Sequence, residues 1–189
     1  MRRLKPKSEE DSKKRTTQFI VGGILIFIML FSTLGYAFGG GSGGTSNAVK
    51  YNGYIFENVN GLWVLDKGGI NFVFLYNPKE TNDIVSTVKP INNYYSKPIY
   101  YSSKNNDATY ELGRNLEPVA LRFLPACVEG EECEDNLPIK NCEDNFIIIE
   151  ESDTNEIIQD NNCVYLKGNQ EEMVKVVDEF LFKILDVKS

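Results

Sequence analysis

The stretch 145–185, NFIIIEESDTNEIIQDNNCVYLKGNQEEMVKVVDEFLFKIL, holds two apolar, β-branched runs and then one amphipathic run. The first two predict strands on either side of a turn at 153–155, because Asp, Thr and Asn are turn residues. Asn169 followed by Glu172 has the spacing of a helix capping box. Beyond the cap, one face of the predicted helix carries Met173, Val177, Phe180 and Ile184. A C-terminal helix that packs on strands is therefore expected.

Alternating apolar residues and turn signals extend this pattern toward the N-terminus. Residues 51–78 predict three antiparallel strands joined by turns at Asn60-Gly61 and at 67–69. Further elements are expected as a short helix at 81–89, a strand at 97–103 and a helix at 107–125 with Asp107 as N-cap and a kink at Pro118. The fold class that follows is α/β (α+β), one mixed β-sheet domain with about three helices.

An uncharged apolar stretch precedes this domain. Residues 19–38 contain no charged side chain, and as a helix twenty residues span about 30 Å, the thickness of the hydrocarbon core of a bilayer. Residues 1–18 hold seven basic side chains and no apolar periodicity, which predicts a disordered basic tail. The positive-inside rule then places this tail in the cytoplasm and the domain outside. The sequence thus predicts an N-terminal transmembrane helix in a single-pass protein of the cell membrane.

A cleavable secretory signal is the competing interpretation, because 19–31 has the length of a signal core and small residues follow at Ala37 and Gly39. The long basic tail and the full spanning length favour a retained anchor over cleavage. Residues 39–48 are rich in Gly and Ser and predict a flexible linker with a reach on the order of 15–20 Å. The extracytoplasmic domain is therefore expected at 49–189.

Charge is distributed unevenly along the chain. Residues 39–189 carry 13 Lys and Arg against 24 Asp and Glu, a net charge of −11, although the whole chain has −7. An acidic domain repels phosphate backbones, so a nucleic-acid partner is not expected. The expected partners are the membrane, through one span, and an unknown protein or glycan outside.

All four cysteines lie in the predicted outer domain: Cys127, Cys133, Cys142 and Cys163. An even number in an exported domain predicts disulfides, and three pairings are possible. The short loop between Cys127 and Cys133 makes that bridge geometrically easy, which leaves Cys142–Cys163 for the second. Zinc is disfavoured, because the spacings are wide and the chain has no histidine.

No catalytic motif is recognisable. The lack of histidine excludes Ser-His-Asp and Cys-His catalysis, so neither a catalytic residue nor a cofactor is assigned. Glu150, Glu151 and Asp153 leave a carboxylate-based enzyme, such as a glycan hydrolase, as the alternative. The acidic run 129–135 suggests calcium, but the loop spacing of a calcium motif is missing and no metal site is assigned. A binding or scaffolding module is the favoured function.

The tyrosine-rich segment 91–107 is the candidate binding surface. Its tyrosines are interleaved with Asn and Ser: Tyr94, Tyr95, Tyr100 and Tyr101. Tyrosine supplies wide contact area at low entropic cost, and this composition is typical of binding surfaces. The alternative is that each tyrosine packs at the rim of the core.

Several of these features occur together in one group of proteins. The basic tail, the single span, the Tyr-Asn-Gly opening at 51–53 and the stretch LPIKNCEDNFIIIEES…NNCVYLKGN (137–169) resemble small uncharacterised archaeal single-pass membrane-anchored proteins with no assigned function. The resemblance extends from the span onward and rests on cysteines, turns and strand ends. It implies the membrane location and the disulfides, and no activity.

Overall fold

The computed structural model describes residues 22–26, 29, 47–133 and 136–189. The chain divides into two units, 1–45 and 46–189, which are described separately. In the first, residues 22–26 and 29 are helical. No helix within the described ranges is long and apolar enough to cross a membrane. The predicted tail, most of the predicted span and most of the linker lie outside the described residues.

The second unit begins with an antiparallel sheet of four strands in sequential order. Its strands are β1 (Ala48–Tyr51), β2 (Tyr54–Val59), β3 (Leu62–Lys67) and β4 (Ile70–Phe74). The predicted turns at Asn60-Gly61 and at Gly68-Gly69 are confirmed. The three strands predicted within 51–78 are confirmed as β2, β3 and β4, and a further strand, β1, precedes them across a turn at Asn52 and Gly53, with φ of 46° and 83°. An Asn-Gly pair with both φ positive suits a tight hairpin, and it adds β1.

A separate mixed sheet contains five strands in the order β10-β11-β9-β5-β6. Its strands are β5 (Pro98–Ser102), β6 (Arg122–Pro125), β9 (Asn145–Glu151), β10 (Glu156–Asp160) and β11 (Cys163–Gly168). All neighbours are parallel except β10 and β11. The other elements are η1 (Ile91–Asn93), α2 (Asn106–Leu116), β7 (Cys127–Val128), β8 (Ile139–Lys140) and α3 (Met173–Ile184). The α+β class and the mixed sheet are confirmed, but the domain has two main sheets.

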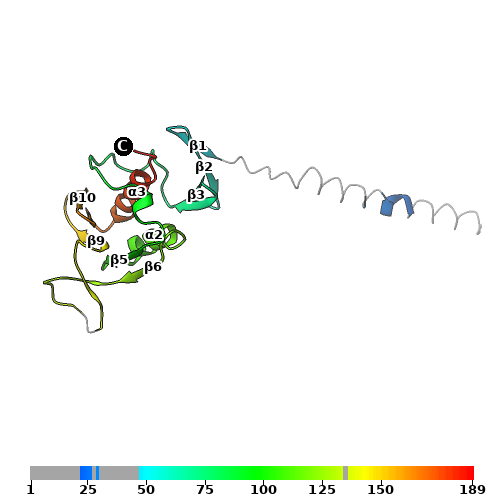
Figure 1. Cartoon of the computed structure of the whole chain (residues 1–189). Coiled ribbons are helices and arrows are strands. Elements are labelled where there is room, and N and C mark those ends of the chain that lie inside the picture. The colour runs from blue at the N-terminus through cyan, green and yellow to red at the C-terminus, as the bar shows by residue number, and fades with distance from the viewer. Residues whose placement is uncertain (1–21, 27–28, 30–46, 134–135) are drawn as a thin grey trace, which may run out of the picture. The chain divides into compact units, whose positions relative to one another are not determined.

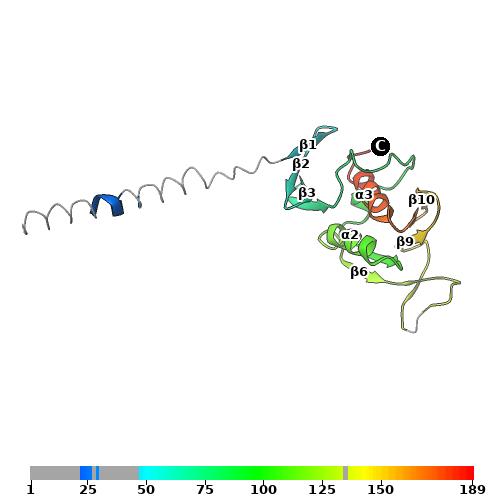
Figure 2. The same ribbon diagram turned by 180° about the vertical axis from the view of Figure 1, so that it is seen from behind.

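In the second unit, α2 and α3 lie between the four-stranded and the five-stranded sheet, as Figures 1 and 2 show from opposite sides. On one side, rings from β2, β4 and α3 pack together: Phe56 and Phe74 lie 5.6 and 4.6 Å from Phe182. On the other side, Ile147 and Ile149 of β9 belong to the same core. Phe146 and Ile148 alternate with them and face a second, smaller core. The main core is thus formed on both sides of the helix layer.

Two predicted helices differ from those observed. The helix expected at 107–125 ends at Leu116, and residues 122–125 form β6 instead. The N-cap is Asn105, two residues before the predicted Asp107, because Asn105 Oδ1 accepts a hydrogen bond from the Ala108 N–H at 2.9 Å. Pro118 follows the helix rather than kinking it. Residues 81–89, predicted as a helix, contain neither helix nor strand, and β-branched residues in this segment disfavour helix.

The strands near the C-terminus are connected differently from the prediction. The expected pairing across the turn at 153–155 does not occur, because β11 lies between β9 and β10. The loop 152–155 therefore crosses the end of β11, where the Ser152 N–H donates to the Gly168 carbonyl at 2.9 Å. A Cβ at Gly168 would lie 2.8 Å from Asn155 Oδ1. A larger residue at this position would therefore require the Asn155 side chain to shift.

Helix α3 follows the prediction closely. Its four predicted face residues, Met173, Val177, Phe180 and Ile184, are all buried. Half of the capping box is present, since the Glu172 N–H donates to Asn169 Oδ1 at 2.9 Å. The Glu172 carboxylate does not return to Asn169 but accepts from Asn155 Nδ2 at 2.7 Å. The cap thus also fixes the loop that crosses β11.

Candidate functional site

The order of the parallel strands places a cleft beyond the carboxyl ends of β5 and β9 in the mixed sheet. From β5 the chain passes through α2 to β6 on one side, whereas β9 lies on the other side of β5. The direction of the connections therefore reverses between β5 and β9. In open sheets with such a switch point, ligands bind beyond the carboxyl ends of the two strands. We call the cavity at this position the switch-point cleft.

The switch-point cleft is small and polar. Its volume is about 110 Å³, and it is lined by Lys104, Asn105, Ile149, Glu151, Gln170 and Met173. An adjoining hollow of about 340 Å³ shares Lys104, Ile149 and Glu151 and adds residues from β5 and from the acidic loop, including Ser102 and Glu131. Lys104 and Glu151 therefore line both spaces.

Local hydrogen bonds shape the wall on the β5 side. Ser103 Oγ both donates to the Asn105 carbonyl and accepts from the Asn105 N–H, each at 3.1 Å. Asn105 then caps α2, so the first turn of this helix opens beside Lys104. The N-terminus of a helix favours negative charge. This wall is thus suited to an anionic group of a ligand, whereas Glu151, which also lines the cleft, suits a hydrogen-bond donor.

The carboxylates singled out from the sequence are not equivalent. Glu150 binds Lys167 across the ladder, with Oε2 and Nζ 3.0 Å apart. The hydrogen bond and the charge of Glu150 raise the pKa of Lys167 above its usual value. Glu151 also lines the cleft, but Asp153 lies exposed in the crossing loop and lines neither cavity. The structure therefore brings Glu150 and Glu151 to the same hollow, with Glu150 already paired.

The four tyrosines have different environments. Tyr94 is buried against Phe180, and this burial raises the pKa of its hydroxyl well above the usual value. Tyr100 is buried in the smaller core, where its hydroxyl accepts from Arg122 at 2.9 Å. Tyr101 stacks on Phe123, with ring centroids 4.5 Å apart. Tyr95 is 42% exposed. The four side chains are thus not gathered on one exposed face, and their role in binding stays a prediction.

Both predicted disulfide pairings are present. Cys127 is bonded to Cys133 and Cys142 to Cys163, with Cα–Cα distances of 5.9 and 4.8 Å that suit disulfides. The second bridge ties the loop before β9 to the first residue of β11. Among the described residues no group of three or more His, Cys, Asp or Glu is arranged to hold a metal ion. Two members of the acidic run, Glu134 and Asp135, lie outside those residues.

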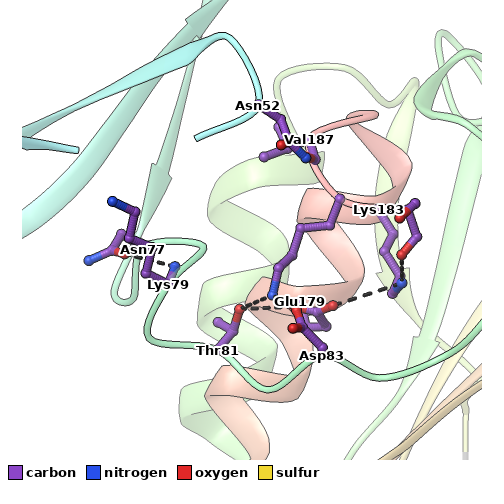
Figure 3. Close-up of polar contacts among 10 residues, drawn as sticks. Asn52, Asn77, Lys79, Thr81, Asp83, Glu179, Lys183 and Val187 are labelled. Atoms are coloured by element: carbon purple, nitrogen blue, oxygen red, sulfur yellow. Dashed lines mark hydrogen bonds and ion pairs between the residues drawn. The ribbon is translucent and has the colours of Figure 1, made fainter. Parts of the chain in front are cut away.

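A buried charge cluster lies at the C-terminal end of α3 (Figure 3). Glu179 Oε2 accepts from Thr81 Oγ1 at 2.8 Å and from Lys188 Nζ at 2.7 Å. Lys188 Nζ also lies 2.7 Å from Asp83, and Lys183 Nζ lies 3.8 Å from Glu179. Burial lowers the pKa of Lys188, but the hydrogen bonds and charges of Asp83 and Glu179 outweigh it and raise the pKa above its usual value. Its carboxylates and ammonium groups are occupied by one another, which makes this cluster structural.

A second buried pair joins the two helices to the end of β4. Glu111 of α2 accepts from the Leu75 N–H at 3.2 Å, and Asp178 of α3 accepts from the Tyr76 N–H at 2.9 Å. Burial, followed by the charge of Glu111 and its hydrogen bond, raises the pKa of Asp178 well above its usual value. Glu111 also binds Arg114 of its own helix. This pair is also internal.

Comparison with known proteins adds no assignment. No family model matches the chain, and no curated protein or solved structure matches it significantly. The switch-point cleft could not be found in the sequence, because it depends on the order of β5, β6 and β9. The nearest sequence signal is the predicted strand at 97–103 followed by the predicted helix at 107–125.

Proposed function

We propose that the chain is a membrane-anchored binding module whose domain, 49–189, lies outside the cell. The observation that carries the proposal is the presence of two disulfides within this domain, with no free cysteine among its described residues. Structural disulfides persist in oxidising compartments and are rare in the cytosol. The uncharged stretch 19–38 would supply the single span, and the basic residues 1–18 would remain in the cytoplasm.

Within this module we propose the switch-point cleft as the binding position. Lys104 and the first turn of α2 suit a carboxylate or phosphate, and Glu151 suits an ammonium or hydroxyl group. The ligand class that fits is a small polar molecule, or the end of a glycan or peptide, that carries an anionic group beside a hydrogen-bond donor. A cleft of about 110 Å³ admits only such a small group.

Binding is favoured over carboxylate catalysis. Hydrolysis of glycosides uses two carboxyl groups, one of which must hold a proton. Glu150 is paired with Lys167, and Glu151 is the single acidic residue that lines the cleft itself.

Protease treatment of intact cells tests the location. The full chain with an N-terminal epitope tag is expressed, and protease is added outside. We expect the tag to survive on a short membrane fragment that resists alkaline extraction, while the domain is digested. A domain that stays intact until the cells are permeabilised would place it inside. A domain released into the medium would replace the anchor with a cleaved signal.

A further inference from the structure

The outer edge of β10 borders a groove. Residues 82–85 form one wall and residues 155–158 the other, and the cavity between them has a volume of about 490 Å³. We call this cavity the edge groove and residues 81–89 the connecting segment. β10 is an edge strand, with β11 on one side only. An edge strand presents unpaired N–H and C=O groups that can pair with a further strand.

The strand register identifies the groups that point into the groove. A two-residue loop, Asn161-Asn162, joins the ladder partners Asp160 and Cys163, and such a closing pair is hydrogen-bonded. Because backbone groups alternate in direction along a strand, those of Ile157 and Gln159 point away from β11. Their N–H and C=O groups lie at the open edge.

The connecting segment does not fill this edge. Within the described residues, no backbone-to-backbone hydrogen bond joins 81–89 to β10, although the Lys89 N–H donates to the Gln159 side-chain oxygen at 3.2 Å. Side chains anchor both ends of the segment instead: Asp83 binds Lys188 at 2.7 Å, and Lys89 Nζ donates to Asn162 at 2.6 Å. Between these anchors Val85 is fully exposed. Residues 82–85 and the edge strand β10 thus border one cavity without a backbone-to-backbone hydrogen bond between them.

The lining of the groove indicates the chemistry of its occupant. Two side chains are acidic: Glu156, and Asp83, which is paired with Lys188. No Lys or Arg occurs in 82–85 or 155–158, and the remaining side chains are Asn, Ile and Val. Strand addition gains affinity from main-chain hydrogen bonds and specificity from alternate side chains. We propose that the edge groove binds an extended segment of a partner protein, with Lys or Arg between β-branched residues, as a strand added to β10.

This proposal gives a partner class for the proposed binding module. It depends neither on the membrane anchor nor on the switch-point cleft. The test employs the full chain in detergent micelles and a capped eight-residue peptide of alternating lysine and valine. We expect saturable binding and amide exchange slowed at least about tenfold at Ile157 and Gln159, because an added strand shields these N–H groups. A peptide of alternating lysine and glycine should bind several-fold more weakly.

Charge variants separate the groove from general attraction to an acidic domain. Glu156→Lys should weaken binding at least about threefold, the range expected for a surface charge. Glu57→Lys makes the same charge change at an exposed position of β2 and should leave binding unchanged. Glu156→Gln serves as a milder variant if the reversal disturbs folding.

Three results would each overturn the proposal: no saturable binding, binding without slowed exchange at the two amides, or equal losses in Glu57→Lys and Glu156→Lys. The location outside the membrane and the cleft would remain to be judged by their own experiments, since neither contributes to this groove.

Discussion

Glu179 and Lys188 form a buried ion pair, with Oε2 and Nζ 2.7 Å apart, that closes the C-terminal end of α3. Thr81 and Asp83 bind the same two groups from the connecting segment. Nearby, Asn52 Nδ2 donates to the Val187 carbonyl at 2.9 Å and joins the first hairpin to the C-terminal residues. Segments that are about a hundred positions apart in sequence are thus held together by one set of polar contacts.

Removing both members of the pair should cost less than the sum of the two single removals. Lys188→Met leaves Glu179 buried with its main cation gone, and we expect a loss of about 3 kcal/mol in the free energy of unfolding. The double variant Glu179→Gln with Lys188→Met should lose less than the sum of the two single losses. Urea unfolding of all four proteins measures this coupling, and additive losses would show that the pair is not coupled.

The same lysine predicts a response to alkaline pH. Because the pKa of Lys188 is raised in the folded state, its stabilisation is fully present below the unfolded value of about 10.4 and is lost as pH rises through the folded value. Unfolding free energy measured from pH 8 to 11 should therefore fall less steeply in Lys188→Met than in the wild type. Equal slopes would contradict the raised pKa.

The raised pKa of Asp178 predicts that stability also changes with pH on the acidic side. Its folded pKa is raised, so its contribution is present below about pH 3.9 and is lost as pH rises through the folded value. Asp178→Asn keeps an acceptor for Tyr76 and a donor for Glu111, and should make stability less dependent on pH above 4. The exposed Asp66→Asn is the matched control. If the stability of Asp178→Asn falls with pH as steeply as that of the wild type, the raised pKa of Asp178 is contradicted.

The two disulfides should contribute unequally. Replacing Cys142 and Cys163 by alanine opens a loop with a sequence separation of 21 and should cost about 3 kcal/mol, whereas the Cys127 and Cys133 double variant, with a separation of 6, should cost about 2 kcal/mol. Thermal and urea unfolding compare the two variants. A larger loss from the shorter loop would mean that contacts of Cys127, rather than chain entropy, dominate.

Lys104 should matter for ligand binding and not for folding. Lys104→Glu changes an exposed side chain, so unfolding free energy should stay within about 0.5 kcal/mol. Glutamate, which carries carboxylates and an ammonium group, serves as probe. Adding free glutamate to the protein should shift the amide resonances of residues 105–108 in the wild type and in Lys79→Glu but not in Lys104→Glu. Shifts that persist in Lys104→Glu would remove the cleft from the proposal.

Local patterns predicted the elements whose partners are near in sequence. The turns at Asn60-Gly61 and Gly68-Gly69, strand β5 and the buried face of α3 are confirmed. The connecting segment was wrongly predicted as a helix. The contacts that determine its conformation join residues far apart in sequence, such as Thr81 and Glu179, and a local pattern does not reveal them. Strand order was likewise hidden, since the insertion of β11 between β9 and β10 depends on long-range pairing.

The candidate site was less predictable than the fold. Tyrosines that suggested a surface from composition are partly core residues, because Tyr94 and Tyr100 each face a hydrophobic cluster. The switch-point cleft consists of residues common in loops, such as Lys104 and Gln170, and only the sheet order gives them a shared position. Cysteine pairing was the exception, because spacing restricts which bridges are possible.

The most direct test of the proposed location is the non-reduced intact mass of the protein extracted from membranes after free thiols are alkylated. We expect the full-length mass with no alkyl group, which means a retained anchor and two closed disulfides. The mass of a shorter chain that begins near Gly40, or a mass that includes alkyl groups on cysteines, would contradict the membrane-anchored, disulfide-bonded module.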